Sequence, residues 1–399
     1  MVKNNDVQTP NEARTFQGNV LRKILESKVL RGTITIRLPN KEKLEVSGDK
    51  GGVHACVQVN KLRAFARIWS NGSVGLAEGY MEQDWETESL SRLLRFLADN
   101  LQQFENIAEG GFAQRIKNSW TKIKNKNSKI GSRKNIAYHY DLGNDFYSLW
   151  LDESMSYSSG IFEKTDDLTK AQTEKYARLC EVSAINRDHR VLEIGCGWGG
   201  LLEHLSSEGC RAEGISVSQE QVNFTNQRLK NEDKVSARFQ DYRDVEGKYD
   251  RIFSVEMFEA VGPQYWDVFA KKVSDLLTQD GVAVMQMITI DEDIFKDYQK
   301  RTDFIQQYIF PGGMLPTQKH IKNMFSSQRL KITDLYQFGQ DYGQTLRQWQ
   351  ERFIRAWPEI KAQGFDNRFF RQWMYYLCYC EVGFNIGRTN VVQIRLERF

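Results

Sequence analysis

The chain has 399 residues, 40% hydrophobic and 12% aromatic, which is enough for two domains with sizeable cores. Its formal net charge of +3 argues against a general polyanion-binding protein, so any basic patch must be local. The six cysteines form no Cys-x-x-Cys pair and have no companion histidine spacing, which argues against a zinc site and favours a reducing cytoplasmic compartment. A polar N-terminus and the absence of a long apolar run argue against a signal peptide or a spanning helix.

The first hundred residues predict a tail followed by a small α+β domain. Residues 1–16 are polar and are predicted to be a disordered tail. Residues 17–106 contain an alternating strand over 32–38, a hairpin partner over 44–46 and a helix over 89–101 with leucines on one face. No catalytic constellation occurs in this part, so we interpret it as an accessory domain.

Residues 107–134 are predicted to be a basic linker. Its cations occur without an acid among them and are Arg115, Lys117, Lys122, Lys124, Lys126, Lys129, Arg133 and Lys134. The segment is either a solvated linker or an interfacial segment for anionic lipid, in which Trp120 and nearby isoleucines would act as apolar anchors. Nucleic acid is the third candidate partner, but no nucleic-acid-binding motif accompanies the patch, so none is expected.

The most informative stretch is residues 190–200, where an apolar strand runs into glycines and then a helix. This order opens nucleotide-binding α/β domains, and the glycine spacing also fits the dinucleotide fingerprint. The next strand, however, ends at Ser216 instead of an acid that could hold a ribose. Glu193 followed by Gly195 and Gly197 resembles motif I of the S-adenosylmethionine (SAM) methyltransferases, in which the carboxylate steadies the glycine loop.

The remainder of the 135–399 domain alternates strands and helices. The predicted strands are 210–217, 235–242, 249–257 and 281–290, and the predicted helices are 168–182, 218–230 and 264–277. This alternation predicts a Rossmann-like, mostly parallel sheet with helices on both faces and a ligand site beyond the carboxyl ends of the strands. An aromatic stripe recurs in the last hundred residues, which fits either a helical core or a long apolar substrate.

Several motifs together resemble the cyclopropane-fatty-acyl-phospholipid synthases, which are SAM-dependent enzymes that act on unsaturated acyl chains. The similar segments are Tyr138-His-Tyr-Asp-Leu-Gly-Asn-Asp, Tyr157-Ser-Ser-Gly, Glu193-Ile-Gly-Cys-Gly-Trp-Gly-Gly, Asp241-Tyr-Arg-Asp, Met257-Phe-Glu-Ala-Val-Gly, Tyr308-Ile-Phe-Pro-Gly-Gly and Asp341-Tyr342. The resemblance covers nearly the whole chain. The N-terminal block, with Glu78-Gly-Tyr-Met81, resembles the lipid-associated accessory domain of this family.

The resemblance implies a set of SAM-binding residues. Those residues are Tyr157, Ser158, Glu193, Gly195, Gly197, Ser216, Gln221, Asp241 and Tyr242. The two glycines would line the cofactor, Ser216 and Gln221 would reach its ribose and neighbouring groups, and Asp241 with Tyr242 would flank its adenine.

The resemblance also implies a catalytic group, in which side chains hold a bicarbonate ion that removes a proton. Its members here are Glu259, Tyr342, Ser159 and Gln286. Ser159 stands where the family has cysteine, and Ala260 and Gln286 stand where it has histidines. Serine and glutamine still donate hydrogen bonds, so bicarbonate remains a candidate second ligand. The changes favour a methyl- or methylene-branched product over a cyclopropane ring, and both products stay open.

Two other functions are compatible with the sequence. The same SAM framework would serve a methyltransferase of a small polar metabolite, although the aromatic C-terminal segments and the basic linker speak against it. A non-catalytic lipid-binding relative is the third alternative, and the intact glycine motif speaks against that. For the favoured function, the expected location is the cytoplasm, peripheral to the inner face of the membrane, with a phospholipid bilayer surface as partner and a homodimer as a candidate assembly.

Overall fold

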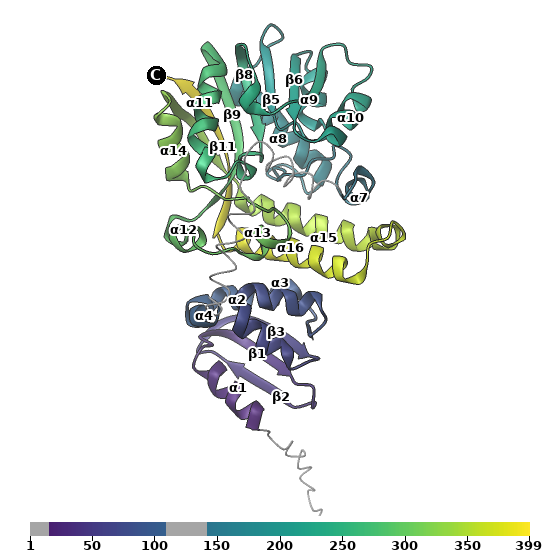
Figure 1. The fold of residues 1–399 in the computed structure, drawn as a ribbon, viewed down its shortest axis with the longest axis vertical. Helices are drawn as coiled ribbons and strands as arrows, with labels where there is room; N and C mark the ends of the chain where they lie inside the picture. Colours follow the sequence, from purple (N-terminus) through teal and green to yellow (C-terminus); the bar gives the residue numbers. More distant parts are fainter. Residues whose placement is uncertain (1–15, 109–141) are drawn as a thin grey trace, which may run out of the picture. The chain divides into compact units, whose positions relative to one another are not determined.

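The computed structural model describes residues 16–108 and 142–399, and the chain divides into two compact units, Met1–Gln114 and Arg115–Phe399 (Figure 1). Nearly all of the tail predicted over residues 1–16 lies outside the described residues, as does most of the basic linker predicted over 107–134.

The N-terminal unit is a four-stranded sheet covered by helices. Its elements are α1 (Phe16–Glu26), β1 (Arg31–Arg37), β2 (Lys43–Ser47), β3 (Lys50–Val59), α2 (Arg63–Met81), β4 (Trp85–Glu86), α3 (Leu90–Asp99) and α4 (Leu101–Ala108). The strand order is β2-β1-β3-β4. The predicted hairpin is confirmed: β1 and β2 are antiparallel, with Ile34 opposite Val46 and Ile36 opposite Leu44, all four buried.

The C-terminal unit is built on a seven-stranded sheet. Its strands are β5 (Arg190–Ile194), β6 (Arg211–Ser216), β7 (Val235–Phe239), β8 (Tyr249–Val255), β9 (Leu277–Ile290), β10 (Leu330–Gln337) and β11 (Thr389–Arg398). They follow the order β10-β11-β9-β8-β5-β6-β7. The strands from β9 to β7 are parallel, whereas β11 is antiparallel to both of its neighbours. The mostly parallel sheet predicted from the alternation is therefore confirmed.

Helices cover both faces of this sheet, as predicted. They are α7 (Asn144–Ser148), α8 (Leu168–Ser183), α9 (Gly200–Ser207), α10 (Gln219–Arg228), α11 (Trp266–Leu276), α12 (Glu292–Tyr298), α13 (Phe304–Tyr308), α14 (Gln318–Ser326), α15 (Gly339–Ala362) and α16 (Asn367–Asn385), with short 3-10 turns η1 (Tyr242–Asp244), η2 (Phe258–Ala260) and η3 (Pro263–Tyr265). Strand side chains alternate between two cores: Val191 packs with α8 and α9, whereas Leu192 packs with α11 and α14.

Helices α15 and α16 form an antiparallel pair that follows β10 and leads into β11 (Figure 1). Asp366 caps α16 by accepting a hydrogen bond from the Phe369 amide at 2.8 Å, the role that aspartate commonly has at a helix N-terminus. Helix α15 continues through Pro358. The buried stripe of Phe353, Ala356 and Ile360 continues past this proline, so tertiary packing offsets the missing backbone hydrogen bond.

The order of the strands places a topological switch point between β5 and β8. The chain leaves β5 towards β6 on one side, whereas β8 pairs with β5 on the other. Loops that leave the carboxyl ends of these two strands therefore turn in opposite directions, which is where open α/β sheets bind ligands. No helix within the described residues is long and apolar enough to cross a membrane.

Asn100 joins a helix and a strand of the N-terminal unit. It ends α3 and is only 2% exposed. Its side-chain oxygen accepts hydrogen bonds from the amides of Leu30 and Arg31 at 2.8 and 2.9 Å, and its nitrogen donates to the carbonyls of Arg31 and Phe96. One side chain thus satisfies four backbone groups at the start of β1 and the end of α3.

We predict that Asn100→Ala lowers the free energy of unfolding of this unit by about 2–4 kcal/mol, because buried amide and carbonyl groups lose their partners. Equilibrium urea unfolding followed by circular dichroism measures the change. The exposed Asn19→Ala in α1 is the matched control and is expected to change the free energy by less than about 0.5 kcal/mol. Equal stability of the two variants would contradict the prediction.

Candidate functional site

The glycine turn after β5 is held by backbone hydrogen bonds and leaves open space above it. The amides of Gly195 and Cys196 both donate to the Ile215 carbonyl, at 2.9 and 3.0 Å. Gly195 has a φ of +84°, and a Cβ there would approach Met257 to 2.5 Å, so only glycine fits. Gly197 has a φ of +52°, and a Cβ there would meet nothing within 4 Å. The backbone is therefore open for the close approach of a ligand at Gly197.

Glu193 lies under this turn as a buried acid. The residue is 3% exposed, and one of its carboxylate oxygens, Oε2, has no hydrogen-bond partner. Burial raises the pKa of Glu193 to about 8, although the nearby Lys175 opposes the shift. A buried acid oxygen without a partner, beside an open glycine turn, suits the positively charged amino-acid end of SAM. The residues present therefore fit the expected cofactor.

Lys175 is a buried cation that the sequence analysis missed. It lies on α8, is fully buried and donates hydrogen bonds to Ser158 Oγ at 2.6 Å and to Gln172 Oε1 at 2.5 Å. Burial lowers its pKa to about 8, while Glu256, Asp152 and Glu193 raise it. The helix was assigned from its periodicity, and a lysine within a helix is usually exposed, so the sequence alone gave no signal.

Ser216 and Gln221, the two residues expected to reach the ribose of SAM, lie together. The Ser216 hydroxyl at the end of β6 donates to Gln221 Oε1 at 2.9 Å, and both residues are buried. The next strand, β7, ends beside them, because the Gln240 amide donates to the Ser216 carbonyl at 3.0 Å. Asp241 follows at once and forms a bidentate ion pair with Arg243 at 2.8 and 2.6 Å. Tyr242, next in the chain, has a buried hydroxyl without a hydrogen-bond partner.

Glu256 is the centre of the second part of the site, at the carboxyl end of β8. Its Oε1 accepts hydrogen bonds from the Ser159 amide at 3.0 Å and from Gln286 Nε2 at 2.7 Å. Its Oε2 accepts one from the Tyr342 hydroxyl at 2.6 Å. The amide of Gln286 is held in this orientation, because its Oε1 accepts from Gln393 Nε2 at 3.0 Å. Three of the four residues expected in the catalytic group thus meet at a carboxylate that the sequence analysis did not single out.

The fourth expected residue, Glu259, lies beside this cluster. Its Oε1 accepts a hydrogen bond from the Ile288 amide at 2.5 Å, and its buried Oε2 has no partner. Burial, together with the charge of Glu256, raises the pKa of Glu259 to about 8. The Ser159 side chain also differs from the expectation, because its hydroxyl donates to the Gly160 carbonyl and only its amide contacts Glu256.

Aromatic rings connect the two parts of the site. From the glycine turn, Trp198 contacts Tyr147 with ring centroids 4.9 Å apart, and Tyr147 contacts Tyr157 at 5.4 Å. Tyr157 then contacts Trp349 at 5.2 Å, and Trp349 contacts Tyr342 at 6.1 Å. The Tyr157 hydroxyl donates to that of Tyr376 on α16 at 2.8 Å. The aromatic stripe of α15 and α16 thus reaches the site as well as the core.

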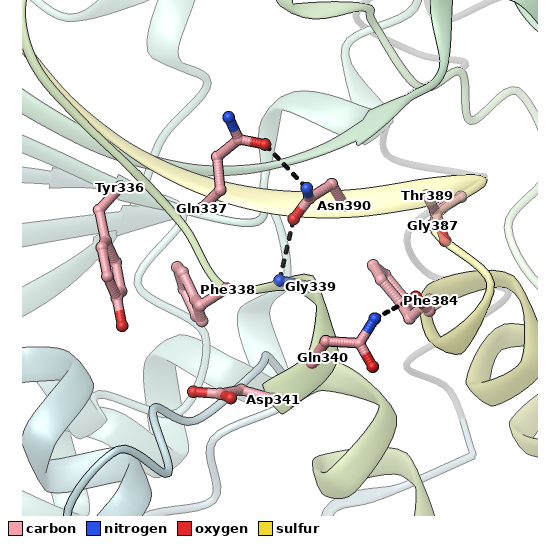
Figure 2. Close-up of a pocket in the computed structure, with 10 residues that line it drawn as sticks. All are labelled: Tyr336, Gln337, Phe338, Gly339, Gln340, Asp341, Phe384, Gly387, Thr389 and Asn390. Carbon is pink, nitrogen blue, oxygen red and sulfur yellow. Dashed lines mark hydrogen bonds between the residues drawn. The ribbon is translucent and has the colours of Figure 1, made fainter.

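A separate hollow of about 280 Å³ lies where β10 passes into α15 (Figure 2). Asn390 bonds across it, donating to Gln337 Oε1 and accepting from the Gly339 amide, both at 2.9 Å, and Gln340 donates to the Phe384 carbonyl (Figure 2). Because these polar groups bond to one another, we assign no ligand to this hollow.

The raised pKa of Glu193 predicts proton release when a cationic cofactor binds. At about pH 7 the free carboxyl is mostly protonated, and a nearby positive charge favours its ionised form, so affinity rises from about pH 6 to about pH 8. Calorimetry of SAM binding in buffers of different ionisation enthalpy measures the released proton. Glu193→Gln is expected to bind SAM more weakly and without this proton release, and unchanged release in the variant would contradict the assignment.

Comparisons with known proteins agree on one family. Residues 127–394 match the model of the mycolic acid cyclopropane synthetase family. The chain is 35% identical to cyclopropane-fatty-acyl-phospholipid synthase of Escherichia coli over 87% of this chain and 89% of that protein. It is 34% identical to tuberculostearic acid methyltransferase UfaA1 of Mycobacterium tuberculosis over 83% of this chain and 80% of that protein.

A solved structure gives the same result. The mycolic acid cyclopropane synthase CmaA1, in complex with SAH and CTAB, superimposes with a TM-score of 0.62 and 26% identity, over 67% of this chain and 98% of that chain. The glycine turn, the buried acid beneath it and these similarities lead to one conclusion. The chain belongs to the mycolic acid cyclopropane synthetase family and is a SAM-dependent methyltransferase.

Proposed function

We propose that this methyltransferase transfers one carbon atom from SAM to the double bond of an unsaturated phospholipid acyl chain. The product is an acyl chain with a cyclopropane ring or a methyl or methylene branch. The observation that carries the proposal is the row of aromatic rings from the glycine turn to Tyr342, which ends at the Glu256 carboxylate. Aromatic surroundings of this kind favour an apolar substrate over a small polar metabolite.

The aromatic rings and the Glu256 carboxylate suit an acyl chain that becomes positively charged during the reaction. The methyl group of SAM is electrophilic, and its addition to an alkene leaves a positive charge on the neighbouring carbon atom of the acyl chain. The face of an aromatic ring such as the partly exposed Tyr157 stabilises such a charge without bonding to it, and a fixed carboxylate adds to the effect. Tyr342, Gln286 and the Ser159 amide act as positioning groups, because each holds Glu256 in place.

Several cofactor contacts are part of the same proposal. Glu193, Gly195 and Gly197 hold the amino-acid end of SAM at the glycine turn. Ser216 and Gln221 bond the ribose, and Asp241 and Tyr242 border the adenine. Support comes from the common edge of the sheet that these residues share. Ser158 takes part through Lys175, and Tyr157 through the aromatic row.

We also propose that the enzyme works at a bilayer surface on the cytoplasmic side, with the N-terminal unit as a lipid-associated accessory domain. Trp69 on α2 is 76% exposed, and Leu62 before that helix is 47% exposed. Lys61 and Arg63 are next to Leu62; both form ion pairs with the buried Asp84, and both keep half-exposed side chains. Amphipathic rings and apolar anchors beside cations are the features by which proteins bind anionic lipid surfaces.

The function predicts a labelled product. With SAM that carries a ¹³C methyl group and vesicles of unsaturated phospholipid, we expect one labelled carbon per modified acyl chain. Nuclear magnetic resonance of the extracted lipid distinguishes ring CH₂, exocyclic methylene and methyl carbons, and therefore decides the product. Saturated phospholipid is the matched control. If the rate of S-adenosylhomocysteine formation were the same with and without unsaturated lipid, the proposal would be wrong.

The membrane proposal predicts that Trp69→Ala weakens binding to anionic phospholipid vesicles about tenfold, because an interfacial aromatic anchor is lost. Vesicle flotation measures the bound fraction. Ile354→Ala removes a side chain that is 50% exposed on α15 and serves as the control, for which we expect unchanged binding. Equal binding by both variants would count against an interfacial role for α2.

A further inference from the structure

Glu256 fills a site that is built for an anion. Three donors from distant parts of the chain converge on its carboxylate: the Ser159 amide, Gln286 Nε2 and the Tyr342 hydroxyl. Ser159 is 0% exposed and Gln286 is 1% exposed, so their polar groups could not turn to bulk water instead. Three buried donors around one acceptor group are the pattern by which proteins bind oxyanions.

The backbone indicates that this carboxylate is held in place at a conformational cost. Glu256 has a φ of +48°, in the left-handed region that favours glycine. It directly follows β8, and its own amide donates to the Gln286 carbonyl at 2.8 Å. A non-glycine residue in this region persists where the surroundings fix it, and such residues occur often at functional sites. Glycine at this position would relax the backbone and vacate the anion site.

The same donors are the groups that were expected to hold bicarbonate. Ser159, Gln286 and Tyr342 belong to the group that the family resemblance assigned to that ion, and each already donates to Glu256. An external bicarbonate on these donors would have to displace a side chain that is attached to the same chain and is therefore present at a high effective concentration. The Glu256 carboxylate and a free bicarbonate ion would thus compete for the same three hydrogen-bond donors.

We propose that the Glu256 carboxylate takes the place of bicarbonate and is itself the catalytic base, an inference that rests on the proposed function. After carbon transfer, one C–H bond breaks on the cationic acyl chain. The proton goes to a Glu256 oxygen, and the released electron pair closes a ring bond or forms a carbon–carbon double bond. The neutral acid then returns the proton to solvent.

The neighbouring groups suit this role. Glu256 keeps some exposed surface, whereas its three donors are buried. Its carboxylate lies among these donors at the carboxyl end of β8, the edge of the sheet at which open α/β folds bind ligands. Burial raises the pKa of the Glu256 carboxyl, which makes it a stronger base than an exposed glutamate. Burial and the charge of Glu256 hold the pKa of Tyr342 well above its usual value, so its hydroxyl stays a donor.

Two substitutions test the inference. Glu256→Gln keeps the shape but cannot accept the proton, so transfer is expected to fall at least about 100-fold, with no recovery in bicarbonate. Glu256→Gly is expected to be equally slow in CO₂-free buffer and to regain at least about tenfold when bicarbonate or formate is added. Wild-type enzyme should lose less than about twofold in CO₂-free buffer. Arg329→Gly, exposed and at a φ of +57°, is the backbone control and should resemble wild type.

A binding measurement separates this inference from the proposed function. With ¹³C-labelled bicarbonate, nuclear magnetic resonance should detect a bound ion in Glu256→Gly and none in wild type or Glu256→Gln, whatever the substrate is. Bicarbonate bound to wild type, a wild-type rate that depends on bicarbonate, or full activity of Glu256→Gln would each overturn the inference. A wild-type enzyme that modifies no unsaturated phospholipid, together with bound bicarbonate only in the glycine variant, would instead refute the proposed function alone.

Discussion

The hydrogen bonds to the Glu256 carboxylate are the interaction on which the rest of the site depends. They join the end of β8, the middle of β9, the start of α15 and the segment before α8. Each bond to a charged group contributes about 1.5–3 kcal/mol. Together they exceed the cost of about 1–3 kcal/mol for a left-handed non-glycine residue. The strain at Glu256 is therefore sustained by its partners, and a loss of those partners would release the loop.

Two acids lie close together here, and their hydrogen-bond partners differ. Glu256 accepts three hydrogen bonds that favour its ionised form, whereas Glu259 accepts bonds only from backbone amides and has one orphan oxygen. Because the negative charge of Glu256 also opposes a second one, the pKa of Glu259 reaches about 8.

On the cofactor side, by contrast with the two acids Glu256 and Glu259, a buried acid lies near a buried base: Glu193 and Lys175. Burial raises the pKa of Glu193 and lowers that of Lys175, and both reach about 8. Near pH 7 the Glu193 carboxyl of the free protein is thus mostly neutral, whereas Lys175 still carries its charge but is close to losing it. A cationic ligand at the glycine turn would restore the charge of Glu193. Lys175 also bonds Ser158, next to Ser159, whose amide contacts Glu256, so α8 links the cofactor side to the carboxylate cluster.

The amino-acid sequence by itself determined the elements and the family motifs. Period-two alternation in the strands and the glycine turn with Glu193 are local, because they depend on residues close together in the chain. They were enough to predict the mostly parallel sheet and SAM, which the fold and the comparisons confirm. The resemblance also selected Tyr342, Ser159 and Gln286, but it gave no reason to choose Glu256 instead of Glu259, three residues apart.

Only the tertiary structure decided which acid those residues surround. The contacts between Glu256 and its three donors span 97, 30 and 86 residues of sequence, so no local pattern can encode them. The same holds for Lys175, whose burial depends on how α8 packs against the sheet, and for the aromatic row, which three separate segments build. Hydrogen bonding and burial set the charge of a side chain, and both exist only once distant parts of the chain have packed together.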